Sequence, residues 1–276
     1  MQRNFIAILA AAVLALAWTA PVLAQDGKVH VLWMGQSSTR ITTPTGKVIV
    51  IDPFLIKNPK TPEKYKDLKN VGHVDVILVT HAHFDHIADA PALAKLNNAK
   101  VWGPAGLDDT WVKLEILPEE LAPRMGKGGP VHPLGDNVNI TITAVHAEHS
   151  SELTAVDPVT GKTRVFPAGE PVGWIVKLEN GYTIYHMGDT GLFSDMKFIA
   201  DYHKPNLIMI PIGGHFVMSP QDAAYATKNW LHPHDAIPFH YGTTPVLRGT
   251  PKEYMDALGS TSTKVHPINP GDELTF

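Results

Sequence analysis

Short apolar runs separated by turn residues follow one another along most of the chain. Runs rich in Val, Ile and aromatic residues that are bounded by Gly, Pro, Asn or Asp predict β-strands. On this pattern we expect strands at Val29–Met34, Arg40–Thr43, Val48–Ile51, Val74–Val79, Ala99–Trp102, Ile140–Val145, Val172–Leu178, Tyr182–His186, Leu207–Ile210 and Ala236–Phe239, and at 264–267 and 273–276.

Other segments predict helices. Pro91 falls in the first turn of one, and a second has Ser219 as its N-cap and Pro220 at its first position. The predicted helices are Ala88–Asn97, 219–231 and Pro251–Leu258. Two runs of strands, each followed by helices, indicate two β-sheets packed on each other with helices outside.

Some segments show neither pattern. Prolines and lysines in 57–74 indicate an exposed excursion, 105–135 is the least regular part of the chain, and 152–170 is an insertion rich in turn residues.

The first 24 residues have the composition of a secretory signal peptide. Arg3 gives a positive start, an apolar stretch runs from Phe5 to Trp18, and Val22-Leu23-Ala24 is a small-residue cleavage site after Pro21. The apolar stretch is too short for a comfortable membrane span, although an uncleaved anchor is the alternative. We predict a mature domain over 25–276, located in the periplasm or secreted, with no stable membrane anchor after cleavage.

The charge, cysteine and histidine content of the chain limits the kinds of functional site that it can form. The 276 residues carry a formal net charge of -4 and no long run of one sign, which argues against an electrostatic nucleic-acid binder. With 15 histidines and no cysteine, thiolate metal sites and cysteine nucleophiles are excluded. A metal must therefore sit on imidazole and carboxylate, which suits zinc, iron or manganese. A homo-oligomer is compatible with the sequence, which gives no sign of its size.

Three histidines and an aspartate follow the buried strand that ends at Val79, in the stretch Thr80-His81-Ala82-His83-Phe84-Asp85-His86. His81 and His83 are two residues apart, so on extended backbone they point the same way and can share one metal. Asp85 and His86 follow a turn later and can hold a second metal beside the first. Two such ions can pin a hydroxide and polarise a substrate oxygen. The alternative is a chance cluster of capping or exposed histidines.

This stretch resembles the signature of the metallo-β-lactamase fold superfamily, and later blocks of the chain follow in the superfamily's order. Gly188-Asp189-Thr190 is similar to its Gly-Asp-Thr block, and Pro238-Phe239-His240-Tyr241 to the block with its last histidine ligand. Ile51-Asp52-Pro53 and Pro211-Ile212-Gly213-Gly214 are similar to UlaG-like, UPF0173-type metal-dependent hydrolases. The resemblance covers nearly all of the mature chain. It implies a four-layer α/β fold, the αββα sandwich, with two mixed sheets and helices on the outer faces.

The resemblance also implies a ligand set for two divalent ions, with Zn²⁺ preferred and Mn²⁺ or Fe²⁺ as alternatives. It assigns one ion to His81, His83 and His149, the other to Asp85, His86 and His240, and makes Asp189 the bridge. His146 competes with His149 because both follow the strand Ile140–Val145. We favour His149.

Three further residues carry weaker expectations. His215 follows a strand and two glycines, where it can bind substrate or donate to a developing oxyanion; a surface loop histidine is the alternative. Asp52 is expected as a turn residue near the metals. Gln36 stands where relatives often carry a histidine, which leaves its role open.

Together these features imply a hydrolase that acts on a small ester, lactone or phosphoester through a metal-activated hydroxide. Asp189, or Asp85 if the second ion is weakly held, would accept the proton. A periplasmic β-lactamase is the second choice. A metal-binding or ligand-binding protein of the same fold without turnover is the alternative from another class. Neither a Gly-x-Ser-x-Gly elbow nor a Gly-rich phosphate loop is present in the sequence.

Overall fold

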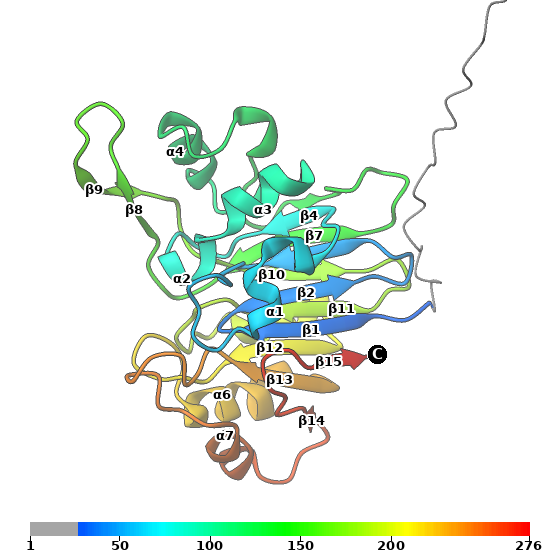
Figure 1. The fold of residues 1–276 in the computed structure, drawn as a ribbon. Helices are drawn as coiled ribbons and strands as arrows, with labels where there is room; N and C mark the ends of the chain where they lie inside the picture. The colour runs from blue at the N-terminus through cyan, green and yellow to red at the C-terminus, as the bar shows by residue number, and fades with distance from the viewer. Residues whose placement is uncertain (1–26) are drawn as a thin grey trace, which may run out of the picture.

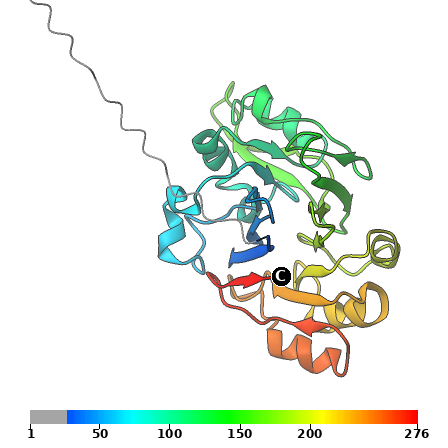
Figure 2. The ribbon, with the colours of Figure 1, turned by 90° about the vertical axis from the view of Figure 1, so that its right-hand side faces the viewer.

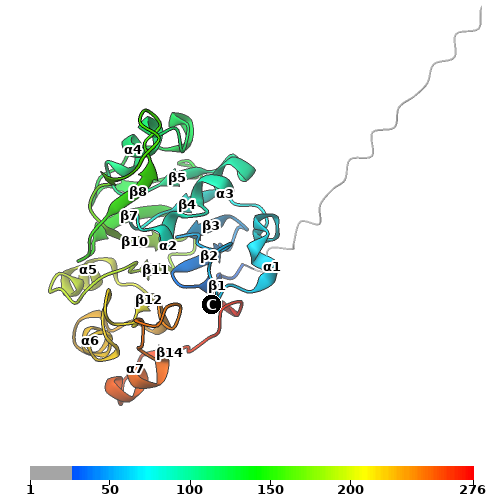
Figure 3. The ribbon, with the colours of Figure 1, turned by 60° about the vertical axis from the view of Figure 1, so that its left-hand side comes forward.

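Residues 27–276 are described by a computed structural model (Figure 1), so the signal peptide predicted at 1–24 lies outside the described residues. Two large sheets lie face to face in the middle of the molecule, and helices cover both outer faces (Figures 2 and 3). The predicted four-layer α/β architecture is therefore confirmed. Over the described range, no helix has the length and apolar character that a membrane crossing needs.

The first sheet has six strands in the order β15-β1-β2-β3-β4-β5. Strand β2 pairs antiparallel with both β1 and β3, whereas β3, β4 and β5 are parallel to one another. Strands β1, β3 and β4 therefore all run in the same direction. The strands are β1 (His30–Gly35), β2 (Ser38–Thr42), β3 (Val48–Ile51), β4 (Val76–Leu78), β5 (Lys100–Trp102) and β15 (Glu273–Thr275).

The second sheet has seven strands in the order β14-β13-β12-β11-β10-β7-β6. Strands β11 to β14 are parallel, and β10 pairs antiparallel with both β7 and β11, so β7, β11 and β13 share one direction. The strands are β6 (Pro130–Val131), β7 (Thr141–His146), β10 (Val172–Lys177), β11 (Thr183–His186), β12 (Leu207–Pro211), β13 (Asp235–Phe239) and β14 (Lys264–Val265).

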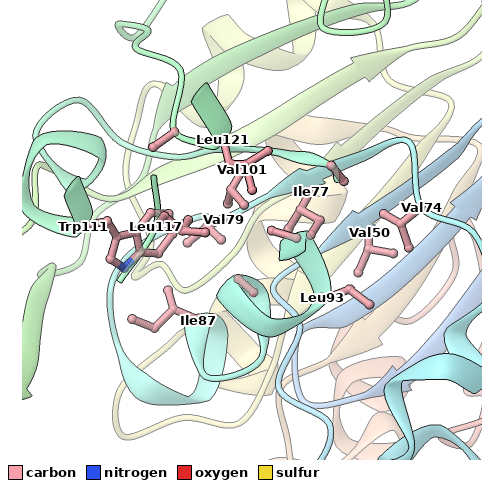
Figure 4. Packing of buried hydrophobic residues seen from close by; sticks show 14 of the residues in the cluster. Val50, Val74, Ile77, Val79, Ile87, Leu93, Val101, Trp111, Leu117 and Leu121 are labelled. Carbon is pink, nitrogen blue, oxygen red and sulfur yellow. The ribbon is translucent and has the colours of Figure 1, made fainter. Parts of the chain in front are cut away.

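Both faces of the central strands are buried, which explains their continuous apolar sequence. In β1, Val31 and Trp33 point into the layer between the sheets, while Leu32 and Met34 point outward under the helices. The inner layer is completed from the second sheet by residues such as Trp174. Figure 4 shows the outer layer of the first sheet, where side chains of helices and loops pack on the strands.

The helices divide between the two faces. On the first sheet lie α1 (Glu63–Lys66), η1 (Leu68–Val71), α2 (Phe84–Ile87), α3 (Ala90–Asn97), α4 (Leu107–Lys113) and η2 (Glu119–Leu121). On the second sheet lie α5 (Met196–His203), α6 (Pro220–Ala226), η3 (Thr227–Leu231) and α7 (Pro251–Leu258). As predicted, Ser219 caps α6, and a reciprocal bond with Asp222 completes the cap.

The structure corrects the expectation of irregular segments. The excursion 57–74 contains α1 and η1 and buries Val71. The segment 105–135 contains α4, and 152–170 forms a β-hairpin from β8 (Glu152–Val156) and β9 (Thr163–Pro167), which projects from the body in Figure 1. The sequence pattern predicted neither helix α5 nor the helical turn α2 that follows His83.

Candidate metal centre

The predicted site residues follow strands that run in one direction within each sheet. Ligand-type residues stand just beyond the carboxyl ends of β3 and β4 in the first sheet, and of β7, β11 and β13 in the second. Because both sheets present these ends at one edge of the sandwich, seven side chains from distant parts of the chain meet there. They are His81, His83, Asp85, His86, His149, Asp189 and His240, which form two groups.

The first group consists of three imidazoles, His81, His83 and His149. Nδ1 of His83 lies 3.0 Å from Nε2 of His81 and 3.3 Å from Nε2 of His149. His81 is fully buried, whereas the side chains of His83 and His149 are 30% and 11% exposed. One side of this group is therefore open to solvent.

The second group consists of Asp85, His86, Asp189 and His240, and it is more deeply buried. Nε2 of His240 lies 3.0 Å from Oδ1 of Asp189 and 3.5 Å from Oδ2 of Asp85. Nε2 of His86 lies 3.2 Å from the same oxygen of Asp189. This group thus combines two imidazoles with two carboxylates.

Asp189 stands between the groups with one oxygen turned to each. Oδ1 faces His86 and His240, and Oδ2 lies 4.0 Å from Nε2 of His81 and 3.8 Å from Nε2 of His149. A carboxylate in this position can serve two cations at once. The structure brings together the residues that the resemblance named as ligands, in the same two sets, and their role as metal ligands stays a prediction.

Unpaired buried atoms show that cations fit this site. Nε2 of His86 and Oδ1 of Asp189 are buried and make no hydrogen bond of acceptable geometry within the described residues. Buried polar atoms are costly when they have no partner. Zinc, manganese and iron bind imidazole nitrogens and carboxylate oxygens as ligands. A divalent ion would therefore give both buried atoms a partner.

Asp52 and Thr80 orient two of the histidines from behind. Oδ2 of Asp52 lies 2.7 Å from Nδ1 of His86, and both carboxylate oxygens accept hydrogen bonds from Thr80. The hydroxyl of Thr80 also lies 3.1 Å from Nδ1 of His81. With Nδ1 engaged in this way, each ring turns Nε2 toward the centre, as is usual for metal-binding histidines.

Glu152 performs the corresponding role for His83. Its carboxylate lies 3.1 Å from Nε2 of His83, which leaves Nδ1 facing the other two imidazoles. Glu152 is the first residue of β8. Sequence reasoning missed this residue, because nothing in the turn-rich segment 152–170 signals that it returns to the His-x-His stretch.

The local backbone is bent to bring these groups together. Asp52 and His240 both have left-handed backbone, with φ of 48° and 56°, a conformation that non-glycine residues adopt at a cost and that concentrates at functional sites. Gly188 allows the loop before Asp189 to approach Thr80, since an added Cβ would stand 2.7 Å from that side chain.

Electrostatics distinguish the two groups. Burial lowers the pKa of His81 and of His149, so both imidazoles are neutral. Burial also lowers the pKa of His240, but Asp189 and Asp85 outweigh it and raise that pKa to about 9. Burial raises the pKa of Asp85, but His86 and His240 hold it at about 2. Before metal binds, the second group is thus an ionised cluster.

The structure distinguishes His149 from His146, between which the sequence left the choice of ligand open. His149 lies in the first group, whereas His146, the last residue of β7, is exposed, with Nε2 3.3 Å from a carboxylate oxygen of Glu148. His215 is exposed, its ring packs against Phe216, and it makes no hydrogen bond or ion pair with the seven residues in the described chain. A catalytic role for His215 stays a prediction.

A cavity of about 300 Å³ adjoins the open side of the first group. His83 and Glu152 line it on one side, and the rest of its wall is mainly apolar, with Phe84, Ile87, Trp111, Ile116, Leu153 and Ala155. Among the described residues, no lysine or arginine lines this cavity.

The sequence and the fold have clear relatives. Residues 47–241 match the family described as the β-lactamase superfamily domain. A UPF0173 metal-dependent hydrolase of Polaromonas sp. is 55% identical over 276 residues, which cover 100% of this chain and 99% of that protein.

Solved structures agree with this picture. Igni18, a metallo hydrolase from Ignicoccus hospitalis, is 31% identical, with a TM-score of 0.76 over 90% of this chain and 98% of that one. Isothiocyanate hydrolase from Delia radicum gut bacteria has a TM-score of 0.65 over 90% of this chain and 99% of that one, at 16% identity. The second likeness concerns the fold alone.

Proposed function

Because the chain belongs to the UPF0173 family of metal-dependent hydrolases, within the β-lactamase superfamily, we propose that it hydrolyses an uncharged ester or lactone that carries an apolar group. The observation that carries this proposal is the cavity beside His83. Its mainly apolar wall suits an acyl or alkyl group, and the carboxylate of Glu152 at its side disfavours an anionic phosphoester. Phosphoesters are therefore the second choice among the substrates that the sequence suggested.

The residues of the centre divide the work. We propose two divalent ions, with Zn²⁺ on the three imidazoles of the first group. When bound, the ions supply a hydroxide at neutral pH and draw charge from a substrate oxygen. Asp189, placed between the groups, accepts the proton, or Asp85 does so if the second ion is weakly held. Asp52 and Glu152 keep His86 and His83 oriented throughout.

A substrate panel tests the proposal. The purified protein is assayed with p-nitrophenyl esters from acetate to octanoate, a series of lactones, bis-p-nitrophenyl phosphate and a β-lactam. We expect turnover of esters or lactones that rises with the length of the apolar group. A preference for the phosphodiester or the β-lactam would contradict the proposed substrate class. Bound metal with no turnover on the whole panel would favour a binding protein instead.

A pair of variants on one strand localises the substrate. Ala155 lines the cavity, whereas Val156, the next residue of β8, is 59% exposed and lies outside it. We expect Ala155→Trp to lower kcat/KM for octanoyl esters and to spare acetyl esters, because it fills the cavity. Val156→Trp, the matched control, should change neither. Equal rates for Ala155→Trp and the wild type on the octanoyl ester would place the acyl group elsewhere.

We also propose that the protein acts in the periplasm or outside the cell. The support is the charged start, apolar stretch and Val22-Leu23-Ala24 site of its first residues. Fractionation of expressing cells with N-terminal sequencing tests this. We expect a chain that begins at Gln25 in the exported fraction, and an uncut chain in the cytoplasm would contradict export.

A further inference from the structure

Gln36, just beyond the carboxyl end of β1, has its carboxamide among the atoms of the second group. The residue is 2% exposed. Its Nε2 lies 2.8 Å from Oδ2 of Asp85 and 2.7 Å from Nε2 of His240. Its Oε1 is buried without a hydrogen-bond partner in the described part of the chain. The contact with Asp85 and His240 is thus made by one atom of the amide, and the other is left unpaired.

No placement of protons satisfies these atoms in the absence of a cation. If Nε2 of His240 carries a hydrogen, the ring is close enough to form an ion pair with Oδ1 of Asp189, 3.0 Å away, but that hydrogen faces the amide hydrogens of Gln36. If Nε2 of His240 carries no hydrogen, it can accept a hydrogen bond from the amide of Gln36, but its lone pair then faces a lone pair of Oδ1 of Asp189. One unfavourable contact persists in either case.

Turning the amide by 180° exchanges two atoms of nearly equal size, Oε1 and Nε2. The oxygen would then face Oδ2 of Asp85 and Nε2 of His240, so that lone pairs of Gln36, Asp85, Asp189 and His240 converge. This cluster is unfavourable when empty and favourable around a cation, because every atom in it then donates a lone pair to the ion.

We propose that Gln36 is a further ligand of the second group and binds its ion through Oε1. The backbone holds the residue ready for this role. The carbonyl oxygen of Gln36 accepts hydrogen bonds from Nε1 of Trp33 at 2.9 Å and from the backbone N–H of His240 at 3.3 Å. Its φ of 52° is left-handed, as at Asp52 and His240.

The added oxygen makes the two groups chemically different. The first offers three imidazoles and one oxygen of Asp189, a set that suits Zn²⁺. The second would offer two imidazoles and three oxygens, from Asp85, Asp189 and Gln36, and oxygen ligands favour Mn²⁺. Gln36 would therefore raise the affinity of the second group for Mn²⁺ relative to its affinity for Zn²⁺. The inference rests on the metal centre of the proposed function and not on its substrate.

Metal binding without substrate tests the inference. Metal-free protein is loaded with one equivalent of Zn²⁺ and titrated with Mn²⁺, and free Mn²⁺ is counted by electron paramagnetic resonance. Gln36→Met removes both amide atoms and should weaken Mn²⁺ binding roughly tenfold or more, in line with losses seen at metal sites. Gln36→Glu keeps an oxygen but has no hydrogen to donate, and it should bind Mn²⁺ at least as tightly as the wild type.

Gln36→His separates ligation from charge. It offers a nitrogen without adding a charge, so it should shift the Zn²⁺ to Mn²⁺ preference toward zinc by roughly tenfold. Binding of the first Zn²⁺ should be unchanged in all three variants, which controls for folding. Equal Mn²⁺ affinity in Gln36→Met and the wild type would overturn the inference. So would equal loss in Gln36→Met and Gln36→Glu, since the hydrogen bond to Asp85 would then be what matters. Because no turnover is measured, this result and that of the substrate panel are independent.

Discussion

The two halves of the metal centre are built for different tasks. His81, His83 and His149 form a group of imidazoles, partly open to solvent and next to an apolar cavity. Asp85, His86, Asp189 and His240 form a buried, ionised group behind it. The contrast teaches that two groups with equal numbers of ligand-type residues differ in burial and charge. We propose that the open group meets the substrate and that the buried group supplies charge. The following variants test that division.

The largest effect is expected where the halves join. Asp189→Asn keeps the shape but weakens the oxygens that face both groups, so both ions should bind more weakly. We expect hydrolysis to fall by more than about a hundredfold, beyond the loss typical of residues that only orient ligands. Metal content by mass spectrometry and kcat/KM report the two effects. Loss of one ion only would mean that Asp189 belongs to one half.

A pair of histidines three residues apart tests the open half. His149→Ala removes an imidazole from the first group, and we expect a loss of activity of at least roughly tenfold together with one metal equivalent. His146→Ala serves as the matched control, because His146 is exposed beside Glu148. Its activity should stay within about twofold of the wild type, as is usual for surface substitutions. The reverse order of effects would reassign the ligand.

A pair of glutamates tests whether the hairpin supports the open half. Glu152→Ala frees Nε2 of His83, and we expect metal affinity to fall roughly tenfold, at the lower end for orienting carboxylates, since Glu152 is exposed. Glu148→Ala removes a carboxylate that lies 3.3 Å from Nε2 of the exposed His146 and makes no ion pair with the seven residues in the described chain. Isothermal titration calorimetry with Zn²⁺ should show a lower affinity for the metal in Glu152→Ala and an unchanged affinity in Glu148→Ala. Equal affinities would leave the hairpin without a role at the metal.

The pH dependence of metal binding should be smallest in the open half. His81 and His149 are already neutral because burial lowers the pKa of each, so the first ion displaces no proton from them. Burial lowers the pKa of His86 and of His240, but Asp189 raises both, that of His240 to about 9, so below that pH the second ion must displace a proton from each ring. Its affinity should therefore rise by more than about tenfold per pH unit below about pH 9. Titrations at pH 6 to 9.5 check this, and equal slopes for both ions would contradict it.

Much of this site could be predicted because its chemistry is local. His81, His83, Asp85 and His86 lie within one stretch, and the buried strands around them are apolar on both faces, so their sequence pattern is strong. The order of the later blocks supplied Asp189 and His240 through resemblance. By contrast, the choice between His146 and His149 depends on how the chain turns back after β7, and local sequence does not determine that turn.

Other features depend on contacts between distant residues. Helix α5 exposes Phe198 and Tyr202, by 68% and 72%, which obscures the apolar face that a sequence reading looks for. Strands β8 and β9 pair with each other outside the two sheets, so they lack the buried alternation of the other strands. Glu152 reaches the centre only through the folded chain, and no motif marks it. Gln36 stands where relatives often carry a histidine, but the sequence did not show that its amide lies beside Asp85 and His240.

Hydrolysis is expected to depend on both halves of the metal centre. Metal-free protein is titrated with Zn²⁺ or Mn²⁺, singly and together, while bound metal and ester hydrolysis are measured on the same samples. We predict no hydrolysis without metal and full activity only near two equivalents, with the double variant His83→Ala/Asp85→Ala inactive and unable to hold either ion. Full activity in metal-free protein would contradict the account.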